Sequence, residues 1–132
     1  MFILDKLSRQ PIYEQMIDQV EKMILQGVLK PGDPLPSVRQ LSMEISVNPN
    51  TLQKAYAELD RRGICFSSPG NGRFVSEDAE TAIQNSRRQG LNQLEALVGE
   101  LAMAGIDKDT VMDVVVRAYN NQTRGKDGVS HD

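Results

Sequence analysis

Residues 11–27 carry apolar side chains at intervals of three and four, which is the spacing of an amphipathic helix. The apolar positions are Ile12, Met16, Ile17, Val20, Met23 and Ile24. Pro11 suits the first turn of such a helix, and Gly27 suits the position that ends it. The pattern therefore predicts a first helix over these residues. The LKPGDPLP segment that follows contains three prolines and a glycine, which indicates a connector rich in turns.

A second and shorter helix is predicted from Ser37 onwards. Ser37, with Gln40 three residues later, matches a capping box. The helix buries Val38, Leu41 and Ile45. This spacing leaves Arg39 and Glu44 facing solvent.

A third helix begins almost at once, because Asn48 is a good N-cap and Pro49 a good first-turn residue. Gly63 lies where its C-terminal cap belongs. The apolar positions of this helix are Leu52, Ala55, Tyr56 and Leu59. Two helices separated by a turn of about three residues form a helix-turn-helix pattern.

The period of the pattern changes from 3.6 to 2 after Gly63, which is typical of strands. The stretches ICFSS and RFVS read as two short strands, and Pro69, Gly70, Asn71 and Gly72 form the turn between them. A helix-turn-helix followed by a β-hairpin is a winged helix, and the hairpin is its wing.

Helical spacing returns from about Glu77 to the end of the periodic sequence. One helix is predicted to begin at Ala79, with Ala82 and Ile83 as its next apolar positions, and to continue towards Gly105. Its later apolar positions form a stripe, called the seam below, of Leu91, Leu94, Leu97, Val98 and Leu101. Gly90 and Gly99 weaken this helix locally. Asp107 can cap a last helix, whose apolar positions are Val111, Val114, Val115 and Ala118.

These elements predict a mostly α fold with a small β-hairpin. We expect a winged helix-turn-helix domain over residues 1–77, a two-helix dimerisation tail over 78–120 and a flexible polar tail over 121–132. A tail of about 50 residues with two helices cannot hide both apolar faces by itself, so a homodimer interface is favoured over intrachain core. The predicted interface residues are Leu91, Leu94, Leu97, Val98, Leu101, Val111, Val114 and Val115.

The residue inventory argues against catalysis and metal binding. Cys65 is the single cysteine of the 132-residue chain and His131 the single histidine, so no metal or redox site can be built from His and Cys. No nucleophile–base pair or phosphate-binding loop stands out, and we expect no enzymatic activity and no cofactor. No apolar run is long enough to span a bilayer and the N-terminus lacks the features of a secretion signal, so a cytoplasmic protein with no membrane partner is expected.

The net charge of −3 is unpromising for a nucleic-acid partner, but the charge is not evenly distributed. Residues 30–76 hold six basic and four acidic side chains, a net charge of +2, which leaves −5 for the rest of the chain. This asymmetry permits a DNA-binding face without demonstrating one.

The predicted third helix carries the residue types that suit a major groove. With its apolar stripe in the core, Asn50, Thr51, Gln53 and Lys54 project outward near its N-terminus. Asn and Gln can pair bidentately with adenine, whereas Thr and Lys can meet base edges or phosphates. An ordinary polar helix face is the alternative interpretation of these four residues, and a plain hairpin is the alternative for the glycine-rich turn.

Several short motifs follow one another in a fixed order along the first 75 residues. They are PIYEQ, the PG and LPS turn, Arg39-x-Leu41, Val47–Thr51, Ala55-Tyr56-x-x-Leu59-x-x-x-Gly63 and Gly70-x-Gly72-x-Phe74-Val75. In this order the chain resembles the GntR-type bacterial transcription regulators. The short two-helix C-terminal part is similar to the YtrA-like subfamily, whose tail serves dimerisation. The resemblance implies a homodimer that binds a palindromic operator in double-stranded DNA, usually as a repressor.

The resemblance also makes Arg39 a DNA contact, with a solvated arginine as the alternative. Arg73, beside Gly70 and Gly72, would place a cation at the wing tip, where the glycines let the backbone approach phosphates or the minor groove closely. The candidate DNA-binding residues are Ser37, Arg39, Asn48, Asn50, Thr51, Gln53, Lys54, Gly70, Asn71, Gly72 and Arg73. A small-molecule effector of unknown identity would bind between subunits or between the tail and the winged helix, since two helices hardly enclose a pocket.

Three points stay open at the level of sequence. Arg61 and Arg62 could touch phosphate, although cations at a helix C-terminus also suit the helix dipole, which is the favoured interpretation. Cys65 is expected to be an inert half-buried thiol and not a redox sensor. The rival to DNA binding is a winged helix used as a protein-interaction module, which the acidic overall charge would fit.

Overall fold

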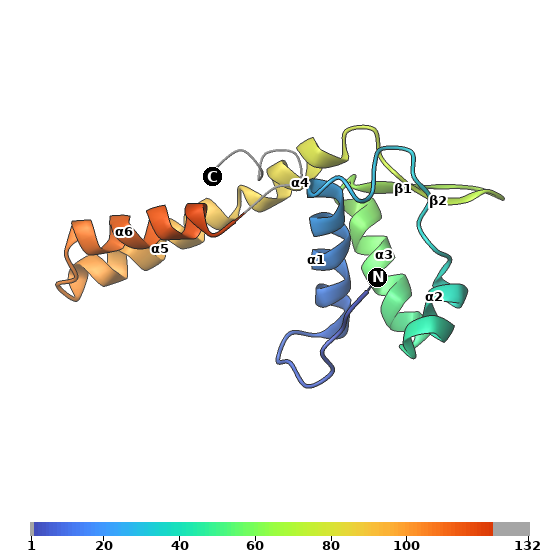
Figure 1. Cartoon of the computed structure of the whole chain (residues 1–132), viewed down its shortest axis with the longest axis horizontal. Coiled ribbons are helices and arrows are strands. Elements are labelled where there is room, and N and C mark those ends of the chain that lie inside the picture. The colour runs from blue at the N-terminus through green and yellow to red at the C-terminus, as the bar shows by residue number, and fades with distance from the viewer. Residues whose placement is uncertain (1, 123–132) are drawn as a thin grey trace. The chain divides into compact units, whose positions relative to one another are not determined.

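The computed structural model describes residues 2–122, which form six helices and one two-stranded antiparallel hairpin (Figure 1). The elements are α1 (Ile12–Leu25), α2 (Val38–Ile45), α3 (Pro49–Arg61), β1 (Cys65–Ser68), β2 (Gly72–Val75), α4 (Ala79–Arg87), α5 (Gly90–Met103) and α6 (Lys108–Asn120). Backbone contacts divide the chain into an N-terminal unit, residues 1–83, and a C-terminal unit, residues 84–132. The mostly α fold with a small hairpin is confirmed. None of the described helices combines the length and the apolar character that crossing a membrane requires.

The core of the N-terminal unit forms around α3, which lies between α1 and α2 (Figure 1). The predicted apolar stripe of α1 is buried except for Ile12, which is partly buried. All four predicted apolar residues of α3 are buried, as are Leu41 of α2 and Val75 of β2. Val38 and Ile45 of α2, which were expected to be buried, are only partly buried against this core. The helical period thus identified the core-facing side of each helix, but not the full depth of burial in α2.

Side-chain caps fix the ends of the helix-turn-helix. Ser37 Oγ accepts a hydrogen bond from the Gln40 backbone N–H at 3.0 Å. The capping box is only half formed, because the Gln40 side chain donates to Glu44 and not back to Ser37. Asn48 Oδ1 accepts from the Asn50 backbone N–H at 2.8 Å and so starts α3 as predicted. Between the two helices Ser46 takes a left-handed conformation with φ +56°, a position usually given to glycine that the sequence pattern did not reveal.

The hairpin pairs Cys65 with Val75 at one end and Ser68 with Gly72 at the other. Gly72 therefore belongs to β2, and the turn is one residue shorter than predicted. The connector before α2 lies along the outer edge of β2, where Leu35 N–H donates to the Arg73 carbonyl at 2.9 Å and Pro34 bridges Phe74. The wing is thus attached to the segment that leads into α2.

The boundary between the units lies beyond the predicted one at residue 77, because Ala79 and Ile83 of α4 are buried in the core of the N-terminal unit. The helix predicted to run from Ala79 towards Gly105 is two helices, α4 and α5. Around the break, Leu91 N–H donates to the carbonyl three residues before it, and not four as in an α-helix. Gly90 lies within this tightened turn and has low helix propensity, which accounts for the interruption.

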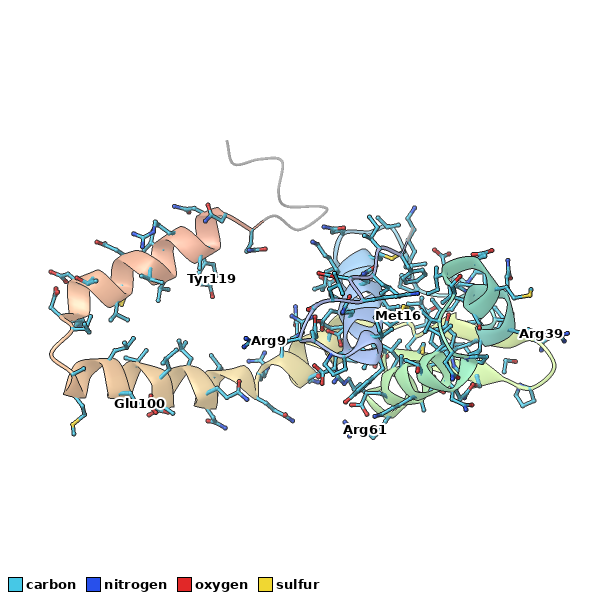
Figure 2. The ribbon with its side chains drawn as sticks, turned by 90° about the horizontal axis from the view of Figure 1, so that it is seen from below. Arg9, Met16, Arg39, Arg61, Glu100 and Tyr119 are labelled. Atoms are coloured by element: carbon cyan, nitrogen blue, oxygen red, sulfur yellow. The ribbon has the colours of Figure 1, made fainter. Side chains whose placement is uncertain are left out.

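The C-terminal unit consists of helices that bury little of their apolar surface. Asp107 caps α6 as predicted, since its carboxylate accepts from the Thr110 hydroxyl at 2.7 Å and from the Thr110 N–H. These hydrogen bonds lower the pKa of Asp107. No residue of α5 or α6 is buried, and the two helices diverge from the turn that joins them (Figure 2). Apart from Asn121 and Gln122, the flexible tail predicted over 121–132 lies outside the described residues.

Candidate nucleic-acid interface

The outward face of α3 displays the residues that the sequence analysis selected. Asn50, Gln53 and Lys54 are exposed, whereas Thr51 is half-buried. Leu52 and Tyr56 on the opposite side of the helix are buried. An exposed polar ridge on a helix whose other side is in the core is a suitable shape for insertion into a major groove.

A groove of about 500 Å³ runs along one side of this ridge, between α3, the start of α2 and the wing. It brings together residues up to 38 positions apart in sequence, from Leu35 to Arg73, and its lining includes Ser37, Gln53 and the wing residues Gly70–Gly72. No carboxylate lines it, so it offers hydroxyl, amide and backbone groups together with the Arg73 guanidinium, and no negative charge. Arg39 lies exposed on α2 at the edge of the N-terminal unit (Figure 2).

The other side of α3 is chemically different. A second groove, of about 530 Å³, runs between α1 and α3 and has Glu14, Asp18 and Glu58 among its lining residues. Lys54 belongs to this side, with its Nζ 3.9 Å from the centroid of the Tyr13 ring in a cation–π contact. The groove between α1 and α3 also holds Lys54, Arg61 and Arg62, so its charges balance, whereas the groove beside α2 and the wing holds no carboxylate that would repel a phosphate.

The end of α3 carries a network of ion pairs. Arg61 and Arg62 both donate to Glu58, and Arg62 also donates to the fully buried Glu21 of α1 at 2.9 Å. The hydrogen bonds from Arg61 and Arg62 lower the pKa of Glu58 to about 2. The two arginines thus form ion pairs within the end of α3, and Arg62 also links α3 to α1. Neither a phosphate contact nor an interaction with the helix dipole, the two interpretations of the sequence, predicted these ion pairs. Glu21 was missed, although its position between Ile17 and Ile24 on the apolar stripe of α1 was a signal of burial.

Arg73 is not the cation at the wing tip that the sequence suggested. Its Nε and Nη2 donate to the two carboxylate oxygens of Asp60 at 3.1 and 2.9 Å, and its guanidinium lies 5.0 Å from the centroid of the Tyr56 ring. The expectation of an outward cation is wrong because α3 supplies a carboxylate directly beneath the inner face of the wing. The glycines Gly70 and Gly72 are exposed and have φ values of +80° and +106°.

Cys65 is buried and not half-buried as expected. Burial raises the pKa of its thiol, and Sγ lies 3.1 Å from Asp60 Oδ1 in a hydrogen bond. A thiol that is held protonated is a poor nucleophile, in keeping with the inert interpretation. Among the described residues, no three His, Cys, Asp or Glu side chains are grouped to hold a metal ion.

The predicted dimerisation residues fall into two groups. The half-buried ones are Val98, Leu101, Val111 and Val115, and the exposed ones are Leu91, Leu94, Leu97 and Val114. Leu91 is 60% exposed within this chain. The sequence analysis missed a further apolar stripe on α6, which consists of Met112, Val116 and the 80% exposed Tyr119. Their spacing of four and three was the available signal.

Comparison with known proteins identifies this arrangement. A profile of "Bacterial regulatory proteins, gntR family" matches residues 12–75, from the start of α1 to the end of the wing. The HTH-type transcriptional repressor YtrA of Bacillus subtilis is 43% identical over 127 residues, which cover 96% of this chain and 98% of YtrA. The chain belongs to the GntR family.

Two solved structures are also similar to this GntR-family chain. The GntR-family transcription factor YtrA from Sulfolobus acidocaldarius is 34% identical with a TM-score of 0.61, covering 72% of this chain and 97% of that one. AraR(DBD) in complex with operator ORX1 is 29% identical with a TM-score of 0.50, covering 56% of this chain and 92% of that one. The resemblance to the YtrA-like subfamily is confirmed, and the chain is a GntR-family transcriptional regulator whose N-terminal unit is a winged-helix DNA-binding domain.

Proposed function

We propose that this GntR-family regulator binds a palindromic operator in double-stranded DNA as a homodimer and represses transcription there. The observation that carries the proposal is the carboxylate-free groove, which places the start of α2, the ridge of α3 and the wing turn next to one another. These are the three parts of a winged helix that can engage a duplex together.

Base readout belongs to the exposed amides of α3 in this proposal. Asn50 and Gln53 are three residues apart, so they lie on the same side of the helix and point along one groove. Each amide presents a donor and an acceptor that match adenine. Thr51 is half-buried, so we assign it a lesser part than its neighbours.

Backbone contacts surround this reading face. Arg39 is exposed on α2 and offers a planar fork that matches a phosphate or a guanine edge. Ser37 and Asn48 stand at the N-termini of α2 and α3, where helix dipoles favour a phosphate. Gly70, Asn71 and Gly72 let the wing backbone approach DNA closely, and Lys54 reaches phosphate from the far side of the ridge.

The lack of buried residues in α5 and α6 supports homodimerisation. Two helices without a buried residue leave an apolar surface that one chain alone does not cover. A second copy would provide the same surface in return, and a two-fold dimer matches an inverted repeat in DNA. Repression is supported by the similarity to a protein described as a transcriptional repressor.

Selection of bound fragments from random double-stranded DNA by the full chain tests the proposal. We expect an inverted repeat, bound by one dimer, with an affinity that falls as salt is added. A site recovered in this way and placed across a promoter should reduce transcription in a purified system when the protein is added. Binding without sequence preference, or no binding to DNA, would contradict the proposal, and the second result would favour a protein-interaction module.

A further inference from the structure

Arg73 occupies a central position among the parts assigned to DNA. It lies on β2 and forms a bidentate ion pair with Asp60 of α3, at 2.9 Å between Nη2 and Oδ2. The Arg73 side chain is only 17% exposed, although it belongs to a wing strand. The pair therefore fixes the wing to the helix that carries Asn50 and Gln53.

The Asp60 carboxylate also holds the other strand of the wing. Cys65 Sγ donates to Asp60 Oδ1 at 3.1 Å, and Ser67 Oγ lies 3.5 Å from Oδ2. Cys65 and Ser67 alternate along β1 and thus share the face that looks towards α3. One carboxylate at the end of α3 consequently anchors both strands.

The same guanidinium is linked to the start of α2 through Tyr56. Its Cζ lies 5.0 Å from the centroid of the Tyr56 ring, and Tyr56 Oη donates to the Pro36 carbonyl at 2.8 Å. Pro36 precedes Ser37, the N-cap of α2. The Arg73 backbone holds this segment as well, since its carbonyl accepts from Leu35 N–H.

We propose that Arg73 and Asp60 are positioning residues for operator recognition, which set the wing and the start of α2 relative to α3, and that Arg73 does not itself contact DNA. This inference rests on the proposed function and deepens it. One edge of the guanidinium is engaged by a carboxylate and one face by an aromatic ring, so its charge is compensated within the chain. A lysine keeps the charge but has neither the planar fork nor the stacking face, and for that reason it cannot replace Arg73 here.

The test uses the full chain with Arg73→Lys, Asp60→Asn and the double variant, and Arg9→Lys at an exposed arginine as the matched control. Each single variant should weaken operator binding roughly tenfold or more. The double variant should lose no more operator affinity than the single variant that binds less tightly, because both changes break the same interaction. Random-DNA affinity and the slope of log K against log salt should stay at the wild-type values. A further variant, Arg73→Gln, removes the charge, and a salt slope lowered by about one in Arg73→Gln but not in Arg73→Lys would show a phosphate contact and overturn the inference.

Hydrogen exchange of the DNA-free protein provides a readout that is independent of the operator. Amides of residues 32–36 and 65–75 should exchange faster in Arg73→Lys and Asp60→Asn than in the wild type and Arg9→Lys, at a temperature where far-UV circular dichroism shows every variant folded. If Asp60→Asn does not fold, Arg73→Lys decides alone. If Arg73→Lys exchanges its amides and binds the operator as the wild type does, the inference is overturned. If the wild-type chain itself shows no sequence preference, the proposed function is refuted, and the hydrogen-exchange result alone then tests the positioning role.

Discussion

The basic side chains of the N-terminal unit differ in whether they already have a partner within the chain. Of the six basic residues between positions 30 and 76, Arg61, Arg62 and Arg73 are paired with carboxylates, and Lys54 lies over the Tyr13 ring. Lys30 and Arg39 are exposed and have no side-chain partner among the described residues, and of the two only Arg39 lies in the helix-turn-helix. A cation whose charge is not compensated within the chain is the one with most to gain from a phosphate.

Arg39→Ala should therefore weaken operator binding by about 1–3 kcal/mol. The melting temperature should not change, because the side chain lies at the surface. Isothermal binding titrations and thermal melts of the full chain test this expectation, and Arg9→Ala serves as the control at another exposed arginine, which Figure 2 shows on a different side of the unit. Wild-type affinity in Arg39→Ala would remove this residue from the interface.

Asn50→Ala and Gln53→Ala should relax sequence preference more than they reduce affinity for random DNA. Each substitution removes an amide that reads a base edge but leaves the phosphate contacts in place, at a cost of about 1–3 kcal/mol for the preferred site. Competition between the selected operator and random DNA measures the difference. Equal losses on both DNAs would mean that these amides hold the backbone and do not read bases.

Residue exposure could be predicted from the sequence, but residue partners could not. The period of α3 correctly placed Gln53 outside and Leu59 inside. The same period says nothing about Asp60 and Arg73, since a contact between positions 13 residues apart depends on how the hairpin folds back. Sequence reasoning consequently identified Arg73 as important and misjudged where its charge points.

At the scale of the elements, the ion pairs at the end of α3 determine how it is joined to α1. Glu58 has a pKa lowered from 4.5 to about 2 by the hydrogen bonds from Arg61 and Arg62. A carboxyl group whose folded pKa is depressed stabilises the fold above its unfolded pKa, and this contribution is lost as the pH falls. The pH window for the loss therefore runs from about 4.5 down to about 2.

Glu58→Gln should lower the free energy of unfolding by about 1–2 kcal/mol near neutral pH. The difference from the wild type should shrink below pH 4.5 and be mostly gone near pH 2, where about half of the wild-type carboxyl groups are protonated as well. Urea denaturation across this pH range measures it. Glu44→Gln is the control, since the partner of Glu44 is the neutral amide of Gln40. A difference that is independent of pH would argue against the ion pairs as its source.

Capping signals located the starts of three helices, and a long apolar seam concealed a break between two others. Ser37, Asn48 and Asp107 each begin a helix as their residue types predict. The seam from Ala79 to Leu101 keeps helical spacing through the interruption before Gly90, so periodicity alone merged α4 and α5. Spacing reports which face is apolar and does not report whether each hydrogen bond reaches back three or four residues.

At the scale of the whole molecule, the two units differ in how far each completes its own core. The N-terminal unit buries its apolar residues, including Ala79 and Ile83, whereas α5 and α6 bury none. An N-terminal domain cut at residue 77 would lose part of its core, so an isolated domain has to extend through α4.

A chain that ends after Arg88 should be a folded monomer that binds one half-site. Its affinity for the full palindrome should fall by about 10²–10⁴ relative to the dimer, because the second half-site is no longer held at high effective concentration. Sedimentation and binding to the palindrome and its isolated half test this expectation. Persistent dimerisation of the shortened chain would place the interface in the winged helix.

Leu94→Glu in the full chain should have the same effect without truncation, since it puts a charge on the predicted seam of α5. Met103→Glu is the matched control, because Met103 is 91% exposed and lies outside the predicted seam. Equal behaviour of the two variants would show that the seam has no special role in association.

The compensation of cations within the N-terminal unit has a consequence for how such a regulator is distributed in a cell. A chromosome offers about 10⁶–10⁹ competing sites, which hold proteins through phosphate neutralisation alone. Three arginines engaged by carboxylates of their own chain contribute little to that hold. We therefore expect weaker retention on bulk DNA than the number of basic residues alone would give, and a larger share of the protein free to reach its site through solution.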